Sequence, residues 1–169
     1  ESNPSTDEGK FEVIGNLTRD SFNTWDSVSW TGLDFAEGPP TSQKFAQVDS
    51  RQGRKQNINV VVWRDDGLPD YMGSGTVAFT SVSALPSARD EIIDADIEVN
   101  TTHYEFADID DAGGPRMDLR NTLTHEIGHL IGLAHTPVED ATMAGGAQPG
   151  EIKKRTLHQD DIDGVCHIY

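Results

Sequence analysis

Three segments in the middle of the chain carry apolar residues in patterns that are typical of β-strands. Residues 58–63 (INVVVW) form a nearly continuous β-branched run, which predicts an interior strand. Residues 75–80 (GTVAFT) predict a second strand, and the glycine-rich approach to it favours an edge position. In residues 91–100 (EIIDADIEVN) apolar and polar side chains alternate, which predicts a third strand. Together these segments predict a β-sheet.

Apolar residues recur at helical spacing on either side of these strands. Residues 17–28 carry apolar side chains three apart, which predicts a short helix. Residues 118–130 predict the clearest helix of the chain, which Asp118 can begin and Gly132 can end. Residues 159–168 predict a short closing helix. The pattern as a whole indicates a mixture of helices and strands.

Length and composition fit a single domain that spans residues 1–169. A chain of 169 residues can bury a substantial core, and 35% hydrophobic with 25% charged residues is typical of a soluble globular protein. Residues 1–9 (ESNPSTDEG) are small and polar, which predicts a flexible N-terminal segment. The sequence shows no repeat and no convincing second-domain boundary.

The chain is strongly acidic, with 13 Lys and Arg against 29 Asp and Glu and a formal net charge of −16. Such a charge repels phosphate backbones and anionic lipids, so we expect neither nucleic acid nor a membrane as a partner. No apolar run approaches the roughly 18 residues that suggest a membrane span. The acidity serves solubility or, in part, binds Ca²⁺ through carboxylates. We expect a monomer.

The single Cys166 excludes an internal disulfide framework, and we expect a buried, inert thiol there. A lone thiol leaves cytosolic and secreted locations both open. The chain starts at Glu1 without Met or a basic and apolar leader, which is typical of a processed mature form.

Residues 125–135 carry the pattern HExxHxxGxxH. His125 and His129 are four residues apart, so on a helix both imidazoles project from one face and can bind one Zn²⁺ at about 2.0–2.1 Å each. Gly132 lets the chain leave the helix sharply, because glycine tolerates backbone angles that other residues avoid. His135 can then fold back to the same metal as a third ligand.

Three protein ligands leave a fourth position for water, which distinguishes a catalytic zinc from a closed structural one. Zinc lowers the pKa of that water to roughly 7. Glu126, next to the first ligand, can take the proton of the water and deliver it to the leaving amine. A pair of histidines four apart is often a surface coincidence, but Gly132 and His135 favour a catalytic zinc with Glu126 as the base.

The extended motif is the signature of metzincin peptidases. Ala141, Thr142 and Met143 resemble the Met-turn of that family, which puts a methionine beneath the metal. Among metzincins the chain most resembles the matrixins, in the compact form found in microbial genomes. The resemblance spans nearly the whole chain and rests on four further segments: residues 22–25 (FNTW), 93–97 (IDADI), 118–121 (DLRN) and 160–169 (DDIDGVCHIY).

This resemblance implies an α+β, zincin-like catalytic domain with a five-stranded, twisted, mostly parallel sheet, an antiparallel edge strand and three helices. It implies a secreted, extracellular endopeptidase that cleaves protein or peptide substrates. The edge strand would bind an extended peptide by strand addition, at Gly75, Thr76, Val77, Ala78 and Phe79. A pocket for a hydrophobic side chain after the cleaved bond would be lined by Thr122 or Leu123 and by Ala144, Gly145 and Gly146.

The chain departs from the matrixin pattern at the second, structural zinc, which mammalian-type matrixins hold with histidine and aspartate. Only His103 is available in that region, so we expect a single zinc. We expect His103, His158 and His167 to be surface or core residues rather than ligands. Small residues replace the Pro-x-Tyr wall that follows the Met-turn, which leaves the shape of the pocket open.

Two acidic loops could supply oxygen ligands for a structural Ca²⁺. Neither matches a fixed motif such as the EF-hand loop, so solvated loops without metal are the alternative. The candidate ligands are Asp65, Asp66 and Asp70, or Asp108, Asp110 and Asp111.

Two other functions stay open. A zinc-binding module without catalysis would not need Glu126, which is present. A hydrolase of a non-peptide amide would not need an edge strand that suits a peptide backbone.

Overall fold

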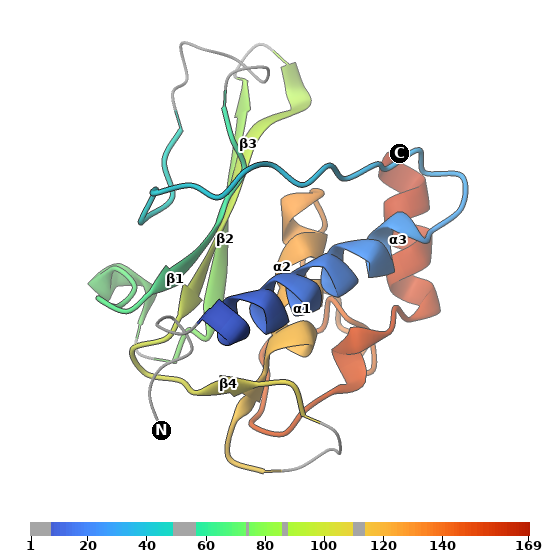
Figure 1. Ribbon diagram of the computed structural model, residues 1–169. Helices are drawn as coiled ribbons and strands as arrows, with labels where there is room; N and C mark the ends of the chain where they lie inside the picture. The colour runs from blue at the N-terminus through green and yellow to red at the C-terminus, as the bar shows by residue number, and fades with distance from the viewer. Residues whose placement is uncertain (1–7, 49–56, 74, 86–87, 110–113) are drawn as a thin grey trace.

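The computed structural model of the protein describes residues 8–48, 57–73, 75–85, 88–109 and 114–169. All three predicted helices are present among them (Figure 1). In chain order the elements, with η for a short 3-10 helix, are α1 (Glu8–Asp26), β1 (Val61–Arg64), η2 (Asp70–Met72), β2 (Ala78–Leu85), β3 (Ala88–Asn100), β4 (Phe106–Ala107), β5 (Met117–Asp118), α2 (Leu119–Leu130), η3 (Lys153–Arg155) and α3 (Gln159–Ile168).

The three segments with strand patterns form one mixed sheet with β3 at its centre. β1 runs parallel to β3, with Val61 opposite Ile97, and β2 runs antiparallel to it, with Ala78 opposite Val99. β2 therefore lies at an edge of this sheet, as predicted. The α+β class is confirmed. A single five-stranded sheet is not, because the described residues form this three-stranded sheet and a separate parallel pair of β4 and β5.

The elements differ from prediction mainly at their ends. β2 begins at Ala78 rather than at Gly75, because the chain is still turning after Gly73, whose φ is +78°. α1 begins at Glu8, well before the predicted start at residue 17, since no proline interrupts this segment. Part of the start that was expected to be flexible thus belongs to α1, and residues 1–7 lie outside the described part of the chain.

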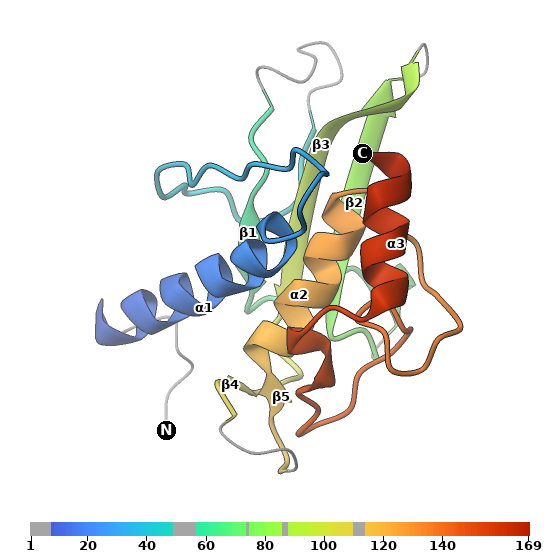
Figure 2. The same ribbon diagram turned by 90° about the vertical axis from the view of Figure 1, so that its right-hand side faces the viewer.

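α2 is the central helix and lies against the sheet. Figure 2 shows it between α1 and α3. Its Leu123 and Ile127 are fully buried and belong to one apolar cluster with Ile97 and Val99 of β3 and Trp25 of α1. Burial of one such aliphatic side chain stabilises a fold by about 1.5–3 kcal/mol. The cluster therefore fixes α2 against both the sheet and α1.

The opposite face of β3 carries buried carboxylates. Asp94, Asp96 and Glu98 alternate with the core residues of the strand and are at most 3% exposed. Asp96 accepts hydrogen bonds from the backbone N–H groups of Gln47 (2.8 Å) and Val60 (2.9 Å). This carboxylate thereby holds two segments that are distant in sequence against the centre of the sheet.

The thiol of Cys166 lies at the surface of the protein. Cys166 is exposed, so the expectation of a buried thiol is wrong. It follows the fully buried Val165, and successive residues of a helix point about 100° apart.

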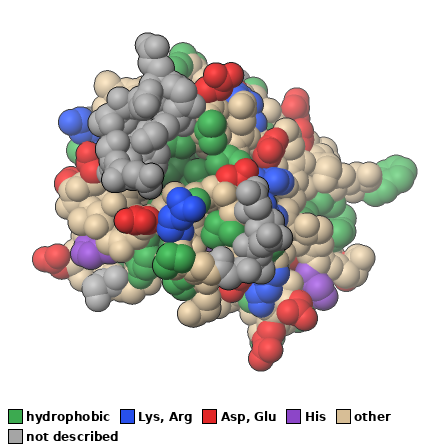
Figure 3. All heavy atoms as spheres, turned by 60° about the horizontal axis from the view of Figure 1, so that its bottom comes forward, with side chains coloured by type: hydrophobic (Ala, Val, Ile, Leu, Met, Phe, Trp, Pro, Cys, Tyr) green, Lys and Arg blue, Asp and Glu red, His purple; other side chains and the backbone are tan. Residues whose placement is uncertain are grey.

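Acidic and basic side chains are interspersed on the face of the protein shown in Figure 3. Among the described residues, no helix is long and apolar enough to cross a membrane.

Asp94 makes the stability of the protein depend on pH. No described residue donates a hydrogen bond to its Oδ1, and burial together with the neighbouring Asp96 raises the pKa of Asp94 to about 6. Because this pKa is higher in the folded than in the unfolded state, the charged carboxyl destabilises the fold above pH 6, and the penalty is lost toward pH 4. In calcium-free buffer we expect Asp94→Asn to raise the Tm by roughly 3 °C at pH 8. The gain should shrink as the pH falls to 5 in thermal melts, and a gain independent of pH would contradict this account.

Candidate active site

Helix α2 carries two of the three predicted metal ligands and begins where the sequence predicts. Asp118 caps its N-terminus, with a carboxylate oxygen 2.7 Å from a backbone N–H of the first turn. His125 and His129 therefore lie one turn apart on the same face. The chain leaves the helix through Gly132, whose φ of +100° is a conformation that favours glycine. This turn brings His135 back toward the other two rings.

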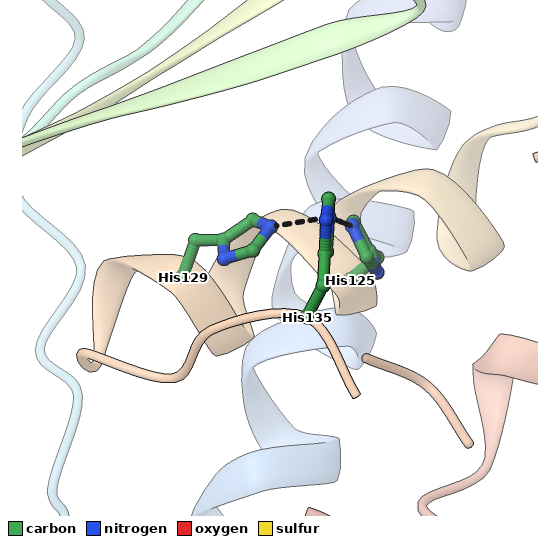
Figure 4. Close-up of side chains that lie close together, drawn as sticks. All are labelled: His125, His129 and His135. Atoms are coloured by element: carbon green, nitrogen blue, oxygen red, sulfur yellow. Dashed lines mark hydrogen bonds between the residues drawn. The ribbon is translucent and has the colours of Figure 1, made fainter. Parts of the chain in front are cut away.

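The three imidazoles point toward one another (Figure 4). Nε2 of His135 lies 3.2 Å from Nε2 of His125 and 3.1 Å from Nε2 of His129. Nδ1 of His125 is 2.6 Å from the backbone O of Thr142, and Nδ1 of His129 is 2.7 Å from the backbone O of Leu133. Because a carbonyl only accepts hydrogen bonds, Nδ1 carries the proton in both rings and Nε2 presents a lone pair.

Converging lone pairs of this kind suit a cation. Two nitrogens bound at about 2.0–2.1 Å to a tetrahedral Zn²⁺ lie about 3.3 Å apart, which is close to the spacing of these rings. Burial lowers the pKa of all three imidazoles, that of His125 to about 3, and metal binding requires neutral rings. In the described ranges, no other three His, Cys, Asp or Glu side chains come close enough to share a metal. The residues present therefore fit zinc.

Glu126, the predicted base, lies beside the histidines on α2 and lines the same cavity. Its side chain is buried, which raises its pKa to about 7. Oγ1 of Thr80 donates a hydrogen bond to Oε2 of Glu126 at 2.6 Å, and this bond lowers the pKa of Glu126. A carboxyl with a pKa near neutrality can both accept and release a proton.

A buried methionine packs against the helix that carries the histidines. A Cβ added at Gly128 would lie 2.2 Å from Sδ of Met143 and 2.9 Å from the ring of Trp25. Only glycine therefore allows this close approach. The backbone N–H groups of Thr142 and Met143 donate to the carboxylate of Asp161 in α3, at 2.8 and 2.9 Å. The predicted Met-turn is thus held by α2 on one side and by α3 on the other.

The histidines and Glu126 line a cleft of about 750 Å³. Residues 75–79, predicted to bind substrate, line it as well, although only the last two belong to β2. Thr122 also lines the cleft, whereas Leu123 is fully buried in the core and does not. Of the two alternatives for the pocket wall, the structure therefore places Thr122 at the cleft.

The segment after Met143 also lines a second cavity of about 400 Å³. Ala144 and Gly145 line the second cavity, and Gly146 lines both. The ammonium group of the buried Lys154 donates hydrogen bonds to the carbonyls of Ala144 and Gly146 and holds the segment in place. Burial lowers the pKa of this lysine.

Sequence reasoning missed several polar residues of the cleft. Lys154 lies in the run KKR, a pattern that is typical of solvated charges. Asn121 could have been found, because it precedes His125 by four residues and so shares its helix face. No pattern in the sequence marks the two other missed polar side chains of the cleft, Thr80 and Gln148.

The six aspartates considered for calcium are only partly placed. Two of them form ion pairs with arginines at 2.7 Å, Asp66 with Arg64 and Asp108 with Arg155. Residues 110–111 lie outside the part that the structure describes. Calcium binding therefore stays a prediction. The remaining two candidates lie between β1 and β2: Asp65 and Asp70.

Two of the other three histidines, His103 and His158, take part in local contacts. His158 caps α3, with its Nδ1 accepting from the backbone N–H of Asp160 at 3.1 Å. Nδ1 of His103 lies 3.2 Å from Oδ1 of Asn100. His167 lies in the last turn of α3. The expectation of a single zinc stays a prediction.

Comparison with known proteins gives matches over nearly the whole chain. A family model described as Matrixin matches residues 3–169. Metalloendoproteinase 1-MMP of Arabidopsis thaliana is 40% identical over 164 residues, which cover 94% of this chain and 38% of the relative. Metalloendoproteinase 5-MMP of the same plant is 47% identical over 53 residues, covering 31% and 14%. Matrix metalloproteinase-25 of Homo sapiens is 28% identical over 136 residues, covering 79% and 24%. The chain thus spans well under half the length of these curated relatives.

Gly128 provides a test of the packing beneath the histidines. We expect Gly128→Ala to force Met143 or Trp25 away from α2 and to destabilise the fold by about 1–3 kcal/mol, with weaker zinc binding. Gly15→Ala in α1 is the matched control, since the three atoms nearest to its added Cβ all belong to the flexible Arg19 side chain, at 3.5 Å or more. Thermal melts and zinc titrations of both variants measure the effect. Equal stability and zinc affinity of Gly128→Ala and the wild type would refute the close approach.

Proposed function

Because this chain belongs to the matrixin family of zinc metalloendopeptidases, we propose that it hydrolyses peptide bonds of extended protein substrates at the three-histidine centre. The observation that carries the proposal is the convergence of three imidazoles beside a buried carboxyl on one cleft of about 750 Å³. This arrangement combines a metal site with an adjacent proton acceptor in a space large enough for a peptide segment.

His125, His129 and His135 would hold the metal through their Nε2 atoms. A bound Zn²⁺ supplies an open coordination position, lowers the pKa of water there to about 7 and polarises the substrate carbonyl. Glu126 takes one proton from the attacking water while the water oxygen forms a bond to the carbonyl carbon of the substrate. The same carboxyl delivers this proton to the leaving nitrogen as the C–N bond breaks.

The position of β2 supports an extended peptide as the substrate. In the sheet of described residues β2 pairs only with β3, so its other side presents backbone N–H and C=O groups without a strand partner. A substrate can add there as a further strand. Because Ala78, Phe79 and Glu126 line the same cleft, a strand added to β2 would run past the histidines. A small non-peptide amide would make no use of this edge.

We further propose a monomer that works outside the cell, without nucleic acid or a membrane as partner. The net charge of −16 supports the monomer, because it repels other copies of the chain. It also supports the absence of nucleic acid and membrane partners, because it repels phosphates. Size-exclusion chromatography with light scattering tests the monomer, since a mass near twice 18.5 kDa would contradict it.

Digestion of a mixed peptide library by the zinc-loaded protein, with sequencing of the products, tests the proposed activity. We expect cleavage within extended peptides and a preference for a hydrophobic residue after the cleaved bond. A catalytically inactive zinc-binding module and a hydrolase of non-peptide amides would both leave the library intact, and that result would overturn the proposal.

Substitution of Glu126 separates catalysis from zinc binding. We expect Glu126→Gln to retain one zinc per chain and to lose cleavage by about 10²-fold or more, because a positioned acid or base contributes about 10²–10⁴-fold. His129→Ala is the companion variant, which should lose the zinc as well. Zinc content by atomic emission and peptide cleavage measure the two effects. Normal cleavage by Glu126→Gln would remove this residue from the mechanism.

Calcium binding by the acidic loops is a separate proposal. It is supported by the loop between β1 and β2, which carries Asp65, Asp66 and Asp70. A ligand that binds only the folded state raises the Tm, so removal of calcium at constant free zinc should lower it. Thermal melts with and without calcium measure the shift, and an identical Tm in both would exclude a structural calcium.

A further inference from the structure

Thr80 of β2 contacts Glu126 at two atoms. Its Oγ1 lies 2.6 Å from Oε2 of the Glu126 carboxyl and 3.0 Å from the Glu126 backbone O. Among the residues that the structure describes, no other group forms a hydrogen bond with this carboxyl. The orientation of the buried carboxyl therefore depends on one hydroxyl that comes from the edge strand.

The hydroxyl of Thr80 can satisfy Glu126 in both of its protonation states. A hydroxyl has one hydrogen to donate and lone pairs to accept with, whereas an ionised carboxylate only accepts. When Glu126 is ionised, Thr80 donates to Oε2. When Oε1 takes a proton, Oε2 still accepts the hydrogen of Thr80. Neither heavy-atom position has to change between the two states.

The backbone that carries Thr80 is itself fixed. Thr80 pairs with Ile97 in the ladder between β2 and β3, and Ile97 is fully buried in the core. Glu126 has a side chain with three rotatable bonds, which would otherwise occupy several rotamers. The hydrogen bond from a rigid strand selects one of them.

We propose that Thr80 is a positioning residue, which holds the Glu126 carboxyl in one orientation through the hydrogen bond to Oε2 and leaves Oε1 to exchange the proton. The proposal rests on the proposed peptidase function. A base that is held within hydrogen-bond reach of its proton gains rate over one that samples several orientations. Loss of the hydroxyl therefore acts on kcat, and zinc binding and substrate docking stay unchanged.

Three variants separate the hydroxyl from the shape of the side chain. Thr80→Val keeps the branched shape and removes the hydroxyl, and Thr80→Ser keeps the hydroxyl. Thr102→Val is the matched control, because its hydroxyl bonds the Arg64 carbonyl at 3.0 Å and does not line the cleft. Each variant is compared with the wild type for zinc content, Tm, kcat and KM on a library-derived peptide, and for the Glu126 rotamer in a crystal structure.

For Thr80→Val we expect full zinc content and KM within about twofold of the wild type. We expect kcat to fall about tenfold or more, because a positioned base contributes about 10²–10⁴-fold and a poorly oriented one loses part of this contribution. Its Glu126 carboxyl should leave the position seen beside Thr80 or occupy more than one rotamer. Thr80→Ser and Thr102→Val should keep wild-type kcat, and Thr80→Ser should also keep the rotamer.

Either an unmoved carboxyl or an unchanged kcat in Thr80→Val overturns the proposal. So does an equal loss of kcat in Thr80→Ser, which would assign the effect to packing of the methyl group. A wild-type protein that cleaves no peptide would instead contradict the proposed function. In that case the crystal structures of the variants still decide whether Thr80 orients Glu126.

Discussion

The convergence of three imidazole Nε2 atoms on one point is the constraint on which the site depends. Nε2 of His135 lies 3.2 Å from Nε2 of His125 and 3.1 Å from Nε2 of His129, a spacing that suits one cation bound by all three rings. Contacts on the far sides of two rings hold it, because the carbonyls of Thr142 and Leu133 accept hydrogen bonds from the Nδ1–H groups and fix the ring orientations. Hydrogen bonds of this kind to metal-binding histidines orient the ligands and tune the metal.

Those contacts are supported in turn by packing between distant segments. The carboxylate of Asp161 accepts hydrogen bonds from the backbone N–H groups of Thr142, Met143 and His158, at 2.8, 2.9 and 2.8 Å. One buried carboxylate thus joins the turn below the histidines to the start of α3. On the other side, Nε1 of Trp25 in α1 donates to a backbone carbonyl of α2 at 2.8 Å. The site is therefore held by all three helices.

The sequence predicts the parts of the site that depend on local spacing. The interval between His125 and His129 and the helix that carries them follow from the 3.6-residue repeat, and Gly132 marks the exit toward His135. The edge strand also follows from its pattern. The contact between Thr80 and Glu126 joins residues 46 apart and depends on the register of β2 and the position of α2 over the sheet, which no local pattern encodes.

Two buried polar side chains, Asp96 and Lys154, occupy positions whose local sequence pattern is typical of exposure to solvent. The polar positions of β3 match a solvated face in the sequence, yet Asp96 is buried because backbone N–H groups of distant segments bind it. Lys154 lies in a charged run but is 1% exposed, since backbone carbonyls surround its ammonium group. In both cases the partner is a backbone group whose position only the folded chain defines.

The most direct test of the metal centre is anomalous diffraction at the zinc edge from crystals grown with Zn²⁺. The account predicts one strong peak about 2.0–2.1 Å from Nε2 of His125, His129 and His135, with a fourth position open to solvent. A peak elsewhere, ligation through Nδ1 or a closed site with four protein ligands would contradict it.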